Sequence, residues 1–133
     1  MKRKNLIYVM VAILATLMAT SCGKQSNPIK VAEKFANAFY NCDFDACNKL
    51  LEKEEFVAKK DMDDMSKAMI KEMQKESKKN GYVAKVNKEE CEIDEEDAWI
   101  VFIITDKEGY EKQGYVELEK DDDGKWLVTR YKL

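Results

Sequence analysis

The sequence predicts an α+β domain in which N-terminal helices pack on a curved four-stranded antiparallel meander. Apolar residues recur at helical spacing over residues 28–79, whereas aromatic and β-branched residues dominate after Gly81. Short acidic segments separate the runs after Gly81, and two of these segments end in Gly, which is typical of hairpin turns. A chain that forms its helices first and its strands afterwards places the helices on one face of the sheet.

Two helices are predicted first. Asn27 followed by Pro28 is typical of an N-cap and the first position of a helix, which we expect over residues 28–41. Asp43 or Asp45 can cap a short second helix that follows directly. The apolar face of the first helix comprises Val31, Ala32, Phe35, Ala38 and Phe39.

A third helical stretch is predicted over residues 54–79. The pattern allows a break near Lys60 and Asp61, and Asn80-Gly81 supplies the left-handed turn that ends many helices. Its methionines recur at spacings of three and four and share one face: Met62, Met65, Met69 and Met73.

This methionine stripe has three interpretations. Packing against the sheet is the one we favour, because methionine stripes at helical spacing usually belong to a core. The second is a plastic apolar pocket lined by Met62, Met65, Met69, Met73 and Trp99. The third is a soft-metal site, but no Cys or His joins the stripe, so we expect no metal.

A basic face lies on the same helix. Lys67 is two positions from Met65, which is about 200° around a helix, so the lysines oppose the methionines. A solvated helix face is the interpretation we favour, and attraction to an anionic membrane is the alternative. The lysines recur every fourth residue, at Lys67, Lys71, Lys75 and Lys79.

Four strands are predicted, over residues 82–93, 98–105, 113–120 and 125–132. The second strand is apolar on both faces, with Trp99, Val101 and Ile103 on one face and Ile100, Phe102 and Ile104 on the other. An antiparallel strand with one face in water should alternate apolar and polar residues. We therefore expect a helix, a dimer partner or a ligand-filled concavity to cover the second face.

Three sequence segments carry a resemblance to a known family. They are Pro28-x-x-Val31-x-x-x-Phe35-x-x-Ala38, Asn41-Cys42-Asp43-Phe44-Asp45-Ala46 and Gly124-Lys125-Trp126-Leu127-Val128. They resemble the small lipoprotein branch of the nuclear transport factor 2-like superfamily, often labelled lumazine-binding-like. The resemblance covers residues 28–133 and implies a cone-shaped, cystatin-like domain. This fold carries both enzymes and non-catalytic binding modules, so it does not determine the function.

Composition excludes several functions. The chain has 133 residues and is 45% hydrophobic, which suits one domain with a packed core. With 23 basic and 26 acidic residues its net charge is −3, so we expect no binding to nucleic acid. The chain contains no His, which rules out a Ser-His-Asp triad, a Cys-His pair or a His-ligated zinc ion. We expect no cofactor.

Residues 1–21 have the three parts of a secretory signal peptide. Basic side chains at positions 2–4 precede an uncharged, mostly apolar run over residues 6–19, and small residues lead to Cys22. This run is shorter than the roughly 20 residues that a membrane-spanning helix needs. We therefore expect cleavage, with a retained N-terminal anchor as the alternative.

Cys22 points to a lipid anchor. The segment Ala19-Thr20-Ser21-Cys22-Gly23 resembles the lipobox of bacterial lipoproteins, in the form found in Bacteroidota. The resemblance implies that Cys22 is lipid-modified and that residues 22–27 form a tether. Several acyl chains hold a protein on a membrane essentially permanently, since each buried methylene contributes ~0.8 kcal/mol. The resemblance to Gram-negative lipoproteins implies sorting to the outer membrane, because Gly23 and not Asp follows the cysteine, and the lack of an acidic run after it implies the periplasmic side. Ordinary cleavage with a free thiol is the alternative.

Three other cysteines have two interpretations. In an oxidising compartment a Cys42–Cys47 disulfide can form across the turn between the first two helices. Alternatively Cys42, Cys47 and Cys91 are buried free thiols, which are common in protein cores.

The sequence therefore predicts a lipid-anchored envelope protein with a non-catalytic domain that binds a small apolar ligand or a protein partner. One alternative is a small hydrolase, dehydratase or isomerase that uses a buried Asp or Glu as base. Its hydrogen-bond donor would be Tyr82, Tyr110, Tyr115 or Tyr131. A third hypothesis, compatible with the first, is a homodimer formed through the outer face of the sheet.

Overall fold

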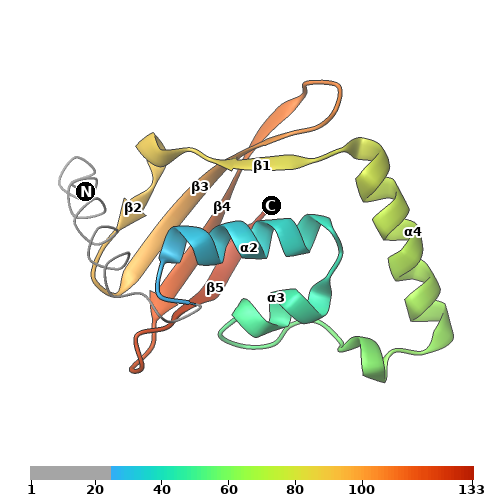
Figure 1. Cartoon of the computed structure of the whole chain (residues 1–133), viewed down its shortest axis with the longest axis horizontal. Coiled ribbons are helices and arrows are strands. Elements are labelled where there is room, and N and C mark those ends of the chain that lie inside the picture. The colour runs from blue at the N-terminus through green and yellow to red at the C-terminus, as the bar shows by residue number, and fades with distance from the viewer. Residues whose placement is uncertain (1–24) are drawn as a thin grey trace.

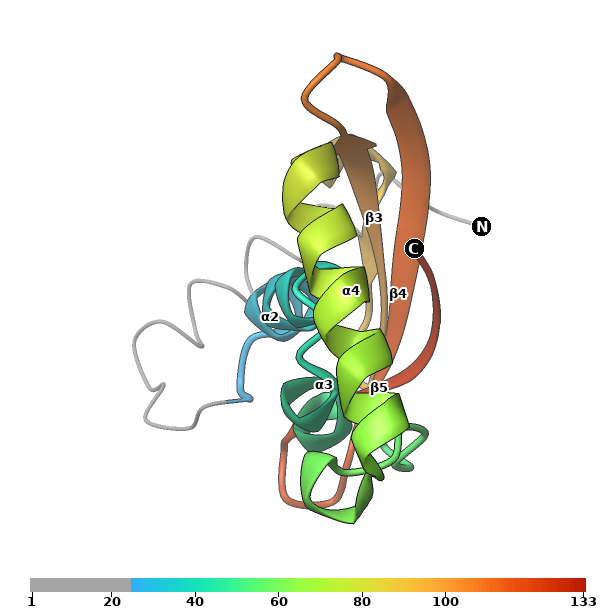
Figure 2. The same ribbon diagram turned by 90° about the vertical axis from the view of Figure 1, so that its right-hand side faces the viewer.

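Helices cover one face of an antiparallel sheet in the computed structural model, which describes residues 25–133. The helices are α2 (Pro28–Tyr40), α3 (Phe44–Leu50) and α4 (Asp64–Asn80). Figure 1 shows α2 crossing the sheet while α4 stands at the far end of α2, and Figure 2 shows α2 and α3 on the same side of the sheet. The predicted α+β class is confirmed. The predicted signal peptide and Cys22 lie outside the described residues.

The cap predicted for the first helix is present. The Asn27 side chain accepts hydrogen bonds from the backbone N–H groups of Ile29 and Lys30 at 3.0 and 3.4 Å, and Pro28 occupies the first turn. The apolar face of α2 is fully buried at Val31, Ala32, Phe35 and Ala36. The predicted helix over residues 28–41 is therefore confirmed to within one residue.

Residues 54–58 are not helical, so the prediction of a helix from residue 54 is wrong there. Instead, the side chain of Asn48 forms hydrogen bonds with the backbone of this segment. Its Nδ2 donates to the carbonyl of Phe56 at 2.7 Å, and its Oδ1 accepts from the N–H groups of Glu55 and Phe56 at 3.2 and 3.1 Å. The Phe56 ring also stacks on Phe44, with 4.5 Å between centroids. A single 3₁₀ turn (Lys59–Asp61) then precedes α4.

The sheet has five strands, paired in the order β1-β3-β4-β5, with β2 also paired to β3. All these pairings are antiparallel. The strands are β1 (Val83–Val86), β2 (Glu92–Ile93), β3 (Asp97–Thr105), β4 (Glu111–Lys120) and β5 (Trp126–Lys132).

The single strand predicted over residues 82–93 is divided into β1 and β2, which corrects that prediction. Between them a 3₁₀ turn (Lys88–Glu90) leaves the ladder. This turn forms a bulge between β1 and β2, and the residues on either side of it both form hydrogen bonds with Val101 of β3. The N–H of Asn87 donates to the carbonyl of Val101 at 2.8 Å, and the N–H of Val101 donates to Sγ of Cys91 at 3.3 Å. Both backbone polar groups of Val101 therefore keep a hydrogen-bond partner, although the acceptor of its N–H is the Cys91 sulfur and not a backbone carbonyl.

The two apolar faces of β3 have different surroundings. Ile100, Phe102 and Ile104 are buried in the core together with Phe35 of α2. On the outer face Val101 is also buried, and Trp99 stacks on Tyr115 with 4.2 Å between ring centroids. The outer face is thus partly covered by side chains of the sheet itself. Within residues 25–133, no helix combines the length and apolar character needed to cross a membrane.

Gly114 of β4 lies where a side chain has no room. A Cβ at this position would be 2.8 Å from Cδ1 of Ile104 and 2.8 Å from the backbone carbonyl oxygen of Lys132. We predict that Gly114→Ala lowers the free energy of unfolding by about 1–3 kcal/mol, because strand β5 must move to accommodate the methyl group. Urea denaturation measures this, with Gln113→Ala at the exposed neighbouring position as control. An unchanged midpoint for Gly114→Ala would contradict the packing described.

Candidate functional site

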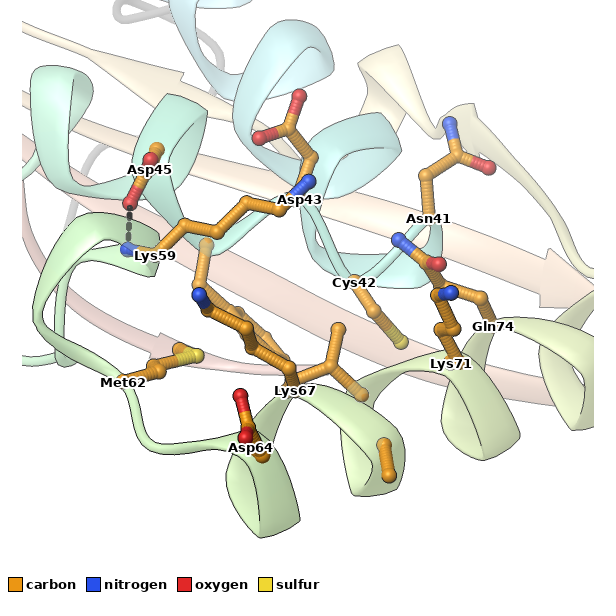
Figure 3. A pocket seen from close by; sticks show the side chains of 13 residues that line it. Asn41, Cys42, Asp43, Asp45, Lys59, Met62, Asp64, Lys67, Lys71 and Gln74 are labelled. Atoms are coloured by element: carbon orange, nitrogen blue, oxygen red, sulfur yellow. Dashed lines mark hydrogen bonds between the residues drawn. The ribbon is translucent and has the colours of Figure 1, made fainter.

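A cavity of about 820 Å³ lies between the turn that joins α2 to α3 and one face of α4 (Figure 3). The turn contributes residues 41–45, and the connection to α4 contributes Lys59 and Met62. Helix α4 contributes a further wall that includes Lys67, Ile70 and Lys71. The volume falls within the range that holds small-molecule ligands in proteins.

The shape of the turn follows from its sequence. Cys42 has a left-handed backbone with φ of 55°, which reverses the chain directly after α2. Asp43 then caps α3, since its Oδ1 accepts the N–H of Ala46 at 3.2 Å. In Figure 3 the sulfur of Cys42 points toward α4, while the Asp43 carboxylate points away from it.

Helix α4 is held mainly at its C-terminal end. Ser77 Oγ donates to the backbone carbonyl of Tyr40, and the N–H of Lys107 donates to the carbonyl of Asn80 at 2.9 Å. Gly81 ends the helix with φ of 61° and passes so close to Lys107 that a Cβ would lie 3.2 Å from the Cβ of that lysine. No residue of α4 is buried. The cavity therefore occupies the space between the body of the domain and the rest of the helix.

The methionine stripe is not part of the core, so the interpretation favoured from the sequence is wrong. Met65, Met69 and Met73 are 75%, 61% and 45% exposed. The attachment at Ser77 turns Ile70 toward the cavity, and Ile70 lies about 140° around the helix from Met65. The inward wall of α4 therefore includes Lys67 and not Met65.

The five residues predicted to line a pocket do not gather around one cavity. Met62 lines the cavity, whereas Met65 and Met69 are exposed. Met73 borders a separate groove beside Tyr40 and Tyr82. Trp99 lies on the outer face of the sheet, because odd-numbered side chains of β3 point away from the helices.

Cys42, Cys47 and Cys91 are buried free thiols in the structure. Cys42 precedes the cap of α3 and Cys47 follows it by four positions, which is the spacing of a hydrophobic staple. Burial raises the pKa of Cys47 to about 12, with the nearby Asp43 and Cys42 as smaller causes. Burial also raises the pKa of Cys91. Protonated thiols are poor nucleophiles. A Cys42–Cys47 disulfide in the exported, oxidised protein stays a prediction.

The charged side chains of the cavity wall are open to solvent. Every Asp and Glu between positions 25 and 133 is at least partly exposed, and the buried polar residue in this range is Asn48. None of its cysteines and carboxylates cluster in a way that could hold a metal ion. Three carboxylates and three lysines line the cavity: Asp43, Asp45, Asp64, Lys59, Lys67 and Lys71.

Sequence reasoning missed Asn48 and Lys59 as determinants of the site. Asn48 holds the connection to α4 in place, and Lys59 projects from that connection into the cavity wall. An Asn in the last turns of a short helix carries no special sequence signal. Only the contacts of its side chain with Glu55 and Phe56 reveal its role.

Comparisons with known proteins identify the fold. A crystal structure from Campylobacter jejuni, described as an NTF2-like transpeptidase, matches with a TM-score of 0.54 and 20% identity. The match covers 79% of this chain and 99% of that chain. The protein therefore has the NTF2-like fold, and identity at this level shows the fold alone.

A second solved structure has a weaker likeness. The helical cell shape determining protein Pgp2 from Campylobacter jejuni matches with a TM-score of 0.41 and 12% identity, over 74% of this chain and 37% of that one. A TM-score below 0.5 does not establish a shared fold. Neither a protein-family model nor a curated protein matches the sequence.

Tyr40 makes the stability of this region depend on pH. Its hydroxyl donates to the backbone carbonyl of Leu133 at 2.7 Å, and burial, with a smaller contribution from Tyr82, raises its pKa from 10.0 to about 12. The neutral phenol therefore stabilises the fold fully below pH 10, and this contribution is lost as pH rises through about 12.

We predict that Tyr40→Phe lowers the free energy of unfolding by about 1 kcal/mol at neutral pH through loss of this hydrogen bond. It should also flatten the fall in stability between about pH 10 and 12. Urea denaturation across this range tests both effects. Tyr110→Phe is the matched control, because Tyr110 is 73% exposed. Equal pH profiles for Tyr40→Phe and the wild type would refute the assignment.

Proposed function

We propose that this protein is a lipid-anchored component of the cell envelope whose NTF2-like domain binds a small apolar ligand without catalysing a reaction. The cavity between the α2–α3 turn and α4 is the observation that carries the binding function. The lipobox-like segment ending at Cys22 supports the anchor, on the periplasmic side of the outer membrane. The same features support a lumazine-binding-like lipoprotein of the Bacteroidota type.

Binding is favoured over catalysis by the residues around the cavity. The structural neighbour is described as a transpeptidase, but covalent catalysis needs a nucleophile activated by a nearby base. This chain contains no His, and within residues 25–133 its cysteines are buried and its carboxylates are exposed. We therefore do not extend that activity to this protein.

Self-association is compatible with this function. The outer face of the sheet presents Trp99 and Tyr115 as a stacked pair next to the half-buried Ile103, and Val83 at the sheet edge is 50% exposed. A homodimer formed through this face would leave the cavity open, because the cavity lies on the helical side of the domain. An envelope protein partner could use the same face.

Ligand binding predicts a reproducible additional mass in native mass spectrometry of the full-length protein after exposure to envelope extract. Ile70→Arg should remove this mass, because it would replace apolar surface of the cavity wall by a charged group. Met69→Arg, on the exposed face of the same helix, should leave it unchanged. An additional mass that survives Ile70→Arg would place the ligand elsewhere, and no additional mass would refute the binding function.

The lipid anchor predicts that Cys22→Ser moves the protein from the membrane fraction to the soluble fraction and abolishes incorporation of labelled palmitate. Cys42→Ser is the control, because Cys42 lies in the folded domain. A Cys22→Ser protein that remains fully membrane-bound would show that another feature holds it there.

A further inference from the structure

We propose that the ligand of the cavity is an anionic amphiphile, a molecule with an apolar chain that ends in a carboxylate or a phosphate. This inference rests on the proposed binding function and assigns the chemical class of its ligand. It is carried by two properties of the walls: an apolar interior, and lysine ammonium groups without ion-pair partners.

The interior of the cavity has an apolar surface formed by α3, the turn before it and α4. Phe44 lines it from α3 and is fixed by its stacking on Phe56, with 4.5 Å between ring centroids and 17° between planes. Cys42 faces it from the turn and is 8% exposed, and Ile70 faces it from α4. Contact with such a surface favours a hydrocarbon chain over a fully polar ligand.

Three lysines surround this interior. Lys59 comes from the connection before α4, and Lys67 and Lys71 come from α4 itself. In Figure 3 the side chains of Lys67 and Lys71 rise from the helix into the space between α4 and the turn. None of the three forms an ion pair with another residue of the described chain, whereas Lys75, on the same helix but outside the cavity, pairs with Glu72 at 3.5 Å.

The carboxylates of the cavity wall have other roles. Asp43 accepts the N–H of Ala46 as the cap of α3, and Asp45 accepts the N–H of Lys59 at 3.0 Å. Asp64 lies in the first turn of α4, where the helix dipole favours a negative charge. The acids thus stabilise helix starts and the connecting segment. The ammonium groups on the α4 side remain available to an anion, and hydrogen bonds between charged groups are the stronger ones.

Equilibrium dialysis with four eight-carbon probes tests the assignment. The full-length protein is held in phosphatidylcholine nanodiscs, with empty nanodiscs to correct for partition, and the probes are octanoate, octyl phosphate, octanol and octyltrimethylammonium. We expect the two anions to bind about tenfold more tightly than octanol, and the cation to bind most weakly. The ratio of octanoate to octyl phosphate distinguishes a carboxylate ligand from a phosphate ligand.

Two double variants identify the residues. Lys67→Gln with Lys71→Gln should weaken binding of the anions about tenfold and leave octanol within about twofold. Lys75→Gln with Lys79→Gln removes the same charge from α4 outside the cavity and should change neither. Circular dichroism confirms that both variants are folded.

The outcomes separate the two proposals. If octanol binds as tightly as octanoate and this binding is lost in the Ile70→Arg variant, the binding function stands and the anionic class of the ligand is wrong. If the cation binds most tightly, the carboxylates of the wall select the ligand and the inference is likewise overturned. If no probe binds, both the ligand class and the binding function fail.

Discussion

Burial of one face of α2 against the inner face of the sheet is the constraint on which the rest of the structure depends. Phe35 contacts Tyr131 of β5 at 4.8 Å between ring centroids, and it shares the core with Phe102 and Ile104 of β3. This packing determines where α2 ends, and therefore where the turn at Cys42 and the start of α3 are placed. The cavity wall formed by that turn therefore continues directly from the core, to which it is joined by the buried Cys42.

The opposite wall has a different physical basis. Helix α4 has no buried residue, so its position is set by polar contacts, mainly at its C-terminal end, rather than by apolar packing. Asn48 holds the connection that leads into the helix, and Ser77 attaches its C-terminal part to Tyr40. A wall with few buried contacts can move at low cost in free energy, which suits a site that must admit a ligand. The binding function and the weak packing of α4 are therefore consistent with each other.

The residues of the domain are consistent with the proposed binding function. Within residues 25–133, burial raises the pKa of thiols and tyrosines such as Cys47 and Tyr40, which makes these groups harder to ionise. The lysines of the cavity are exposed to solvent. In the proposed site they would contact the negative group of the ligand, and the apolar interior beside them would contact its hydrocarbon chain.

Local structure could be predicted from neighbouring residues alone: the Asn27 and Asp43 caps, the end of α4 at Gly81, the hairpins and the order of helices before strands. Each depends on neighbouring residues, whose conformational preferences are local. Which face of α4 lines the cavity depends instead on contacts made in the tertiary structure. Helical spacing correctly separated Met65 and Met69 from Lys67 and Lys71 but could not orient the two faces, because the orientation is set by Tyr40 and Lys107, far away in the chain. Met62 precedes α4 and lines the same cavity as these lysines. The bulge between β1 and β2 and the role of Asn48 were likewise decided by contacts with distant segments, which no local pattern records.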